Sequence, residues 1–178
     1  MTNESRTISF RPSTLATGFA ALLLVVAAVS FAGLWLSARS DLADRDAAAA
    51  DVRRAEQVAT DYAVGASTID FQHYDTWVTK LKANTSSQLA GKFDTTAPAL
   101  QQVLVPLKWT SSATPINAVV TSSTGGVYKV NVFLDVASTN AQTPDGGQTT
   151  VTYTITVDSG ADWKITDVGG MNSALPLK

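Results

Sequence analysis

The stretch from Leu15 to Leu36, LATGFAALLLVVAAVSFAGLWL, contains no charged residue. A helix rises about 1.5 Å per residue, so this run spans about 33 Å, enough for the hydrocarbon core of a bilayer. A cleaved secretory signal is the alternative, because Ser30-Phe31-Ala32 fits a small-x-small cleavage rule. The apolar run of such a signal is about 7–15 residues, however, and this one continues to Leu36. We therefore favour a retained transmembrane anchor over residues 12–38.

The flanks of this run predict its orientation. Arg6 and Arg11 precede it with one acid, Glu4, whereas both signs of charge follow it. The positive-inside rule then places the N-terminus in the cytoplasm. The predicted organisation is a cytoplasmic tail (1–11), the anchor (12–38), a juxtamembrane helix (39–50) and an extracytoplasmic α+β domain (51–178).

Two features of the anchor predict contacts. Arg11 at its start, and Trp35 with Arg39 at its end, are typical interfacial residues, with a ring at headgroup level and cations in water. Small residues recur at four-residue spacing, which lets a second helix approach closely in lipid. The predicted membrane-helix interface comprises Ala16, Ala20, Ala28, Ala32 and Gly33.

The composition after residue 39 narrows the function. Ten Lys and Arg against fourteen Asp and Glu give this part a net charge of −4, so a nucleic-acid surface is disfavoured. The sequence has no cysteine. Thiol catalysis, thiolate metal sites and disulfide redox chemistry are therefore excluded. A domain of this size can bury a core without disulfides, so the absence of cysteine does not limit the fold.

Helical periodicity comes first in the exported part. An apolar stripe (Ala55, Ala59, Tyr62, Ala66, Ile69) predicts that the helix leaving the membrane continues to about Ile69, with Gly65 as a weak point. We expect a second helix over residues 74–89. We also expect a short third helix that begins near Pro98, since proline suits a first turn, and ends before Pro106.

The period then changes from 3.6 to 2. The segments YKVNVFLDV and VTYTITVD alternate apolar and polar residues, as a half-buried antiparallel strand does. INAVVTS and DWKITDVGG supply two more strands, with turns at residues 124–126, 139–148 and 158–162. Helices followed by strands predict an α+β fold, with helices packed on a curved antiparallel sheet of about four strands.

Several segments in this order, LKANTSSQLAGKF, PLKW, INAVV, YKVNVFLDV, VTYTITVD and WKITDVGG, resemble the Mce-associated membrane proteins of actinobacteria. The resemblance covers roughly residues 51–171. It implies a single-pass protein whose exported domain has a cone-like fold similar to nuclear transport factor 2. It also implies partners, namely a multi-pass permease and other subunits of an Mce lipid or sterol importer. The family supplies no catalytic motif, so no side chain is assigned from it.

The segment DFQHYD holds the main candidates for chemistry. Asp70, His73, Tyr74 and Asp75 fall within six positions, and on a helix Asp70 shares a face with His73 or Tyr74. Acid–base catalysis needs two groups that converge on one substrate atom. Because no second cluster is evident, we favour a polar turn with a solvated histidine. The spacing matches no metal-ligand pattern.

Large apolar residues offer two further hypotheses. Trp77, Trp109 and Trp163 either line a lipid-sized cavity or fill the core, and filling is the commoner role. Phe133 is the misfit among the polar residues on the solvent face of the predicted sheet, so it lies under a helix or at a contact.

We therefore expect a non-enzymatic accessory subunit of an Mce-type lipid importer, with no cofactor. Its anchor would contact membrane lipid and the permease, and its domain would stabilise or regulate the transporter. Two alternatives remain: a membrane-tethered lipid-binding protein or enzyme of the cone fold, and an assembly subunit of a secretion system.

Overall fold

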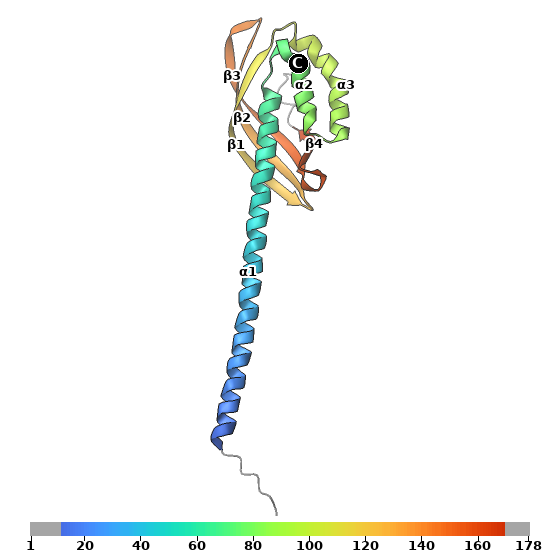
Figure 1. Ribbon diagram of the computed structural model, residues 1–178. Coiled ribbons are helices and arrows are strands. Elements are labelled where there is room, and N and C mark those ends of the chain that lie inside the picture. The colour runs from blue at the N-terminus through green and yellow to red at the C-terminus, as the bar shows by residue number, and fades with distance from the viewer. Residues whose placement is uncertain (1–11, 170–178) are drawn as a thin grey trace, which may run out of the picture. The chain divides into compact units, whose positions relative to one another are not determined.

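The computed structural model describes residues 12–169, with the side chains of residues 31, 35, 39, 40 and 42–169. The chain separates into two compact units, Met1–Ala48 and Ala49–Lys178. The elements run in the order α1 (Pro12–Ser67), η1 (Phe71–His73), α2 (Tyr74–Ala83), α3 (Ser87–Leu104), β1 (Thr110–Thr124), β2 (Val127–Asn140), β3 (Thr143–Asp158), η2 (Ser159–Ala161) and β4 (Lys164–Gly169) (Figure 1).

In the first unit the backbone of α1 is helical from Pro12 onward. Within the part of the chain that the structure describes, no helix is both long and apolar enough to cross a membrane. The Cζ atom of Arg39 lies 5.2 Å from the centroid of the Trp35 ring, and both residues are exposed. The other predicted anchor residues lie outside the residues with described side chains, so their roles remain predictions: Arg11, Ala16, Ala20, Ala28, Ala32 and Gly33.

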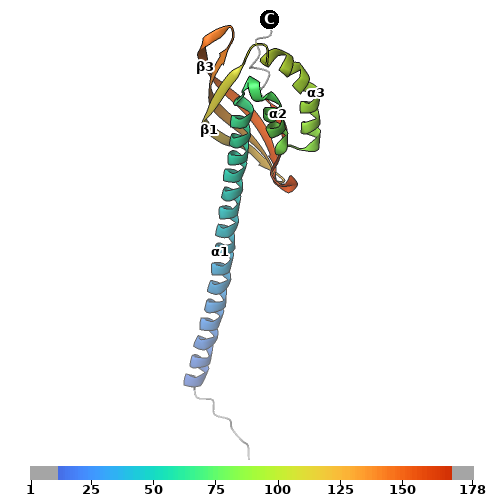
Figure 2. The ribbon, with the colours of Figure 1, turned by 45° about the horizontal axis from the view of Figure 1, so that its top comes forward.

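The second unit is built on a four-stranded antiparallel sheet with the strand order β1-β2-β3-β4. Along β2 every second residue from Tyr128 to Val136 is buried, which confirms the predicted alternation. The last turns of α1 lie on the same face of the sheet as α2 and α3 (Figures 1 and 2). The prediction of an α+β domain with helices on a four-stranded antiparallel sheet is confirmed.

Small residues of α1 allow this helix to approach the sheet closely. Ala55, Ala59 and Ala63 have no exposed surface, because they face the large side chains of the inner sheet face. The largest fully buried side chains, Leu134 and Ile155, come from the two central strands. The large side chains of the core therefore come from the sheet, and α1 covers them with small alanine side chains.

The predicted helix over residues 74–89 is wrong, since two helices occupy this region. α2 ends at Ala83, and Ser86 begins α3 by accepting a hydrogen bond from the backbone N–H of Leu89 (3.2 Å). The predicted short helix starting near Pro98 is wrong for a related reason. Pro98 lies inside α3, so the helix continues through it and lacks the one backbone hydrogen bond that proline cannot donate.

The strands are longer than predicted. The residues expected to form a turn, 139–148, mostly extend β2 and β3, and the side chain of Asn140 closes a tight turn by accepting from the N–H groups of Gln142 and Thr143. β1 begins at Thr110 and carries register shifts at Ile116 and Thr121. These bulges change which face each residue occupies, so the sequence of β1 shows no clean alternation.

Candidate functional site

The strongest candidate for chemistry, Asp70 and His73, forms one contact. Oδ2 of Asp70 lies 2.8 Å from Nδ1 of His73, while Oδ1 accepts a hydrogen bond from the backbone N–H of Gln72 (2.9 Å). Asp70 thereby caps the short helix η1. The two hydrogen bonds lower the pKa of Asp70 below its ordinary value. The contact with His73 has the larger effect, and the hydrogen bond from Gln72 has the second largest. The pair is exposed, so the surrounding water screens its electrostatics.

The other two members of the predicted cluster point elsewhere. Tyr74 is buried, and its hydroxyl donates to the backbone oxygen of Ala97 on α3 (2.7 Å). Burial, followed by the nearby carboxylate of Asp75, raises the pKa of the Tyr74 hydroxyl. The structure thus joins Asp70 to His73 but separates both from Tyr74. Among the described residues, no group of three or more acidic or histidine side chains is placed to hold a metal ion.

The interior of the domain is nearly filled. A cavity of about 60 Å³ remains between Tyr62, Trp77, Phe93 and Tyr153. Sites for small organic ligands usually enclose about 300–1,000 Å³, so this space is too small for a lipid chain. Trp77 and Trp163 pack against the core, which agrees with core filling rather than with a lipid-sized cavity.

Polar groups stabilise the same interior. The Ser67 hydroxyl donates to the hydroxyl of Tyr153 (2.9 Å), and the Ser111 hydroxyl donates to the backbone oxygen of Ser67 (2.7 Å). Burial, with a smaller effect of Tyr153, raises the pKa of Tyr62. Tyr62 is therefore a neutral residue of the core, while Tyr153 contributes to it as the hydrogen-bond acceptor of Ser67.

Two adjoining hollows of about 340 and 590 Å³ lie along α1 and α2. Both are lined by Asp61, Gly65 and Lys80, and the larger one reaches the Asp70–His73 pair. We call their common course the α1–α2 groove, defined by Val58, Asp61 and Gly65 of α1 and by Trp77, Lys80 and Asn84 at α2. Apart from Gly65, which is unfavourable inside a helix, no feature of the sequence indicates this groove.

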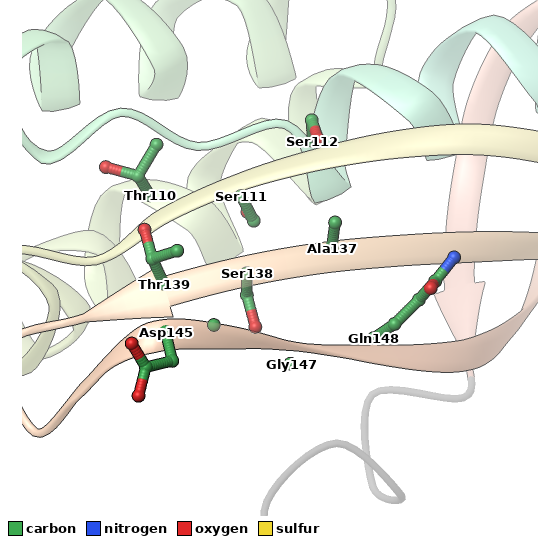
Figure 3. A pocket seen from close by; sticks show the side chains of 10 residues that line it. Thr110, Ser111, Ser112, Ala137, Ser138, Thr139, Asp145, Gly147 and Gln148 are labelled. Carbon is green, nitrogen blue, oxygen red and sulfur yellow. The ribbon is translucent and has the colours of Figure 1, made fainter.

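A third hollow, of about 500 Å³, lies at the end of the sheet where β1, β2 and β3 run side by side (Figure 3). Its lining is mostly Ser, Thr and Gly, and Asp145 is its single titratable residue. Gly146 adopts a φ of 78°, and a Cβ there would come within 3.1 Å of Ser138. Gly146 is therefore required by the backbone conformation of the turn. The hollow contains no pair of titratable groups for acid–base chemistry.

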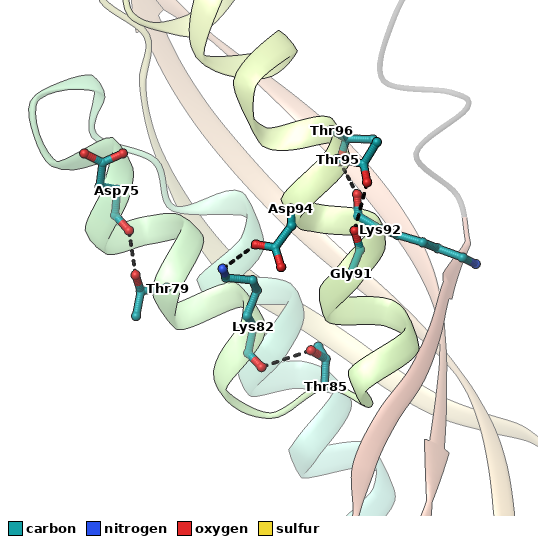
Figure 4. A network of polar contacts seen from close by, with 9 residues as sticks. All are labelled: Asp75, Thr79, Lys82, Thr85, Gly91, Lys92, Asp94, Thr95 and Thr96. Carbon is teal, nitrogen blue, oxygen red and sulfur yellow. Dashed lines mark hydrogen bonds and ion pairs between the residues drawn. The ribbon is translucent and has the colours of Figure 1, made fainter.

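The side of α2 that faces α3 is closed by polar contacts (Figure 4). The Nζ atom of Lys82 lies 2.6 Å from the Asp94 carboxylate on α3, and Thr85 donates to the backbone oxygen of Lys82. The backbone of residues 84–86 also bonds to Ile165 of β4. α2 is therefore fixed on its α3 side, which leaves its α1 side, with Lys80, open to the groove.

Neither a family model nor a curated protein matches this sequence. Solved structures do. An IcmL-like type IV secretion system protein from Legionella pneumophila is similar at a TM-score of 0.50 and 12% identity, over 66% of this chain and 89% of that one. The periplasmic domain of DotI (TM-score 0.48, 16% identity, 64% and 91% coverage) and a periplasmic fragment of TraM (0.44, 17%, 63% and 90%) are also similar.

The likeness to the IcmL-like protein defines the class of the domain by its fold, an α+β domain with helices on one face of an antiparallel sheet. At such low identity it defines nothing more, because one fold supports many functions.

Proposed function

We propose that this chain is a membrane-anchored, non-enzymatic assembly subunit of an envelope transport complex, with its α+β domain outside the cytoplasm. The observation that carries the proposal is the fold shared with the IcmL-like protein, which belongs to a type IV secretion system. The nearly filled interior and the open α1–α2 groove support it, because binding surfaces are what a subunit that works through protein contacts requires.

The preferred complex is a secretion system, since that is where the structurally similar protein operates. The Asp70–His73 pair is compatible with this role as a helix cap rather than as a catalytic pair. An accessory subunit of an Mce-type lipid importer is the second candidate. It is supported by the ordered sequence segments from residue 51 to residue 171, although neither a family model nor a curated protein matches the sequence.

Affinity purification of the tagged full-length chain from its native membranes tests the proposal, with the recovered proteins identified by mass spectrometry. We expect stoichiometric recovery of membrane subunits of a transport complex. Secretion-system subunits would favour the first candidate, and a permease with lipid-binding subunits would favour the second.

A variant whose residues 12–38 are replaced by an unrelated transmembrane helix is the control for the anchor. If the anchor contributes contacts, this variant stays in the membrane but recovers less of the complex. Recovery of the wild-type chain without any companion would contradict the proposed function.

A further inference from the structure

Gly65 destabilises the helix at its position. It lies inside α1, and the glycines with positive φ are Gly125, Gly126 and Gly146, so the backbone of Gly65 is one that alanine adopts equally well. Glycine within a helix is less stable than alanine, because it loses more conformational freedom on folding.

The fold itself gives no steric reason for this glycine. A Cβ built on Gly65 would meet no atom within 4 Å. The Trp77 ring nitrogen does donate to the backbone oxygen of Gly65 (3.2 Å), but that contact is available to any residue. The place of the missing side chain is therefore open, and it lies in the α1–α2 groove.

The two walls of the groove carry opposite charges. Asp61 of α1 is exposed and accepts a hydrogen bond from the Gln57 side chain (2.8 Å). Lys80 of α2 is exposed and has no ion-pair partner among the described residues. Between these charges the floor is apolar, formed by Val58, Tyr62 and Trp77.

The groove favours a helix over a strand as its occupant. Both walls are helical, so their backbone groups are already paired, and an entering strand would leave its own N–H and C=O groups unsatisfied. A helix satisfies its backbone internally. From Val58 to the end of α1 at Ser67 this wall is about 14 Å long, which corresponds to two to three turns of a docked helix.

We infer that the α1–α2 groove docks an amphipathic helix of a partner subunit, with an acidic side chain facing Lys80 and a basic one facing Asp61. Gly65 is the point at which the partner helix approaches α1 most closely. The inference rests on the proposed function and names the surface through which the subunit acts.

Paired glycine variants test the inference in the full-length chain. Gly91 in α3 is the matched control, because it too is an exposed helical glycine whose Cβ would meet nothing within 4 Å. Gly65→Ala and Gly91→Ala should each leave the melting temperature unchanged or higher. In quantitative affinity purification, Gly65→Ala should recover about tenfold less of the partner, since an added methyl overpacks a close contact. Gly91→Ala should match the wild type.

The charge requirement has its own matched pair. Lys80→Glu should lower partner recovery, whereas Lys92→Glu, on the exposed side of α3, should not. A photo-crosslinking amino acid at Thr76, which lines the larger hollow, then identifies the occupant by sequencing the crosslinked peptide. We expect a helix-forming segment of another protein that carries an acidic residue. Changing this residue to lysine should restore recovery by the Lys80→Glu variant.

Two results would overturn the inference. One is wild-type recovery of the partner by Gly65→Ala, which would leave the proposed function standing while removing the groove from it. The other is a crosslink to a second copy of this chain or to its own residues 170–178. Failure of the wild-type chain to recover any companion would instead defeat the proposed function itself.

Discussion

Asp70 shows how a residue chosen as a candidate for chemistry acts in the structure. Its carboxylate holds His73 and caps η1, so both of its oxygens are engaged in local contacts. The three-residue spacing of Asp70 and His73 in the sequence predicted that these two side chains could lie on the same face. It did not show that Tyr74 turns into the core, because that depends on α3, which begins 13 residues later.

Acid titration measures the contribution of Asp70. Its folded pKa is below the ordinary value of about 3.9, so its stabilising effect is present above that value and is lost as the pH falls through the folded pKa. We expect the melting temperature of the wild type to fall more steeply below about pH 4 than that of Asp70→Asn. Parallel curves for Asp70→Asn and wild type would contradict this prediction.

Trp163 occupies the left-handed region (φ 58°), which is unfavourable for a bulky residue. Its ring stacks on Tyr128, with centroids 5.7 Å apart, and the Cζ atom of Arg54 lies 4.8 Å from its centroid. The stack holds the turn before β4 in place. The role of Trp163 in core filling was predictable, but its aromatic and cationic neighbours were not.

Removing the cation should loosen this stack. Arg54→Ala should lose about 0.5–1 kcal/mol of unfolding free energy, the usual size of an exposed cation–π contact. Arg53→Ala is the control, because Arg53 is equally exposed and makes no ring contact among the described residues. Thermal melting followed by tryptophan fluorescence compares the two. Equal losses in both variants would show that the contact adds nothing.

At the scale of elements, neighbouring segments form hydrogen bonds with the edge strands of the sheet. Oε1 of Glu56 on α1 accepts the hydrogen bond of the Val120 N–H on the edge strand β1 (3.1 Å). The start of β1 pairs with Ile69, and β4 is covered by the α2–α3 connection. Pro115 and the bulge at Ile116 interrupt the rest of β1. Such features discourage uncontrolled strand pairing.

The contact between Glu56 and β1 is testable by two substitutions. Glu56→Ala leaves the part-buried Val120 N–H without its acceptor and should cost about 1–3 kcal/mol. Glu56→Gln keeps an acceptor oxygen and should cost clearly less. Chemical denaturation of the purified chain in detergent measures both. If Glu56→Gln and Glu56→Ala lose the same free energy of unfolding, the negative charge of Glu56 is responsible rather than its hydrogen bond to Val120.

At the scale of the whole molecule, all residues of the main core cluster lie in the unit Ala49–Lys178. The chain without residues 1–40 should therefore fold with a melting temperature close to that of the full chain. It should leave the membrane fraction if the uncharged run is a retained anchor. Fractionation and circular dichroism together measure the outcome. Mature protein that starts near Gly33 in wild-type cells would instead indicate a cleaved signal.

The sequence alone determined the class of fold. The change of period from 3.6 to 2 predicted helices and then four antiparallel strands, because burial of one face imposes that spacing locally. The ends of elements were less predictable. The break between α2 and α3 depends on a serine cap and on pairing with β4, and the bulges of β1 depend on its partner strand.

Only the tertiary structure decided where the open surfaces lie. Gly65 was visible in the sequence as a weak helical position, yet its meaning depends on Lys80 and Trp77 of another helix. A groove is a property of two elements and of the space that their side chains leave between them. Sequence periodicity indicates which face of a helix or strand is buried. It does not indicate where the side chains of neighbouring elements leave open space.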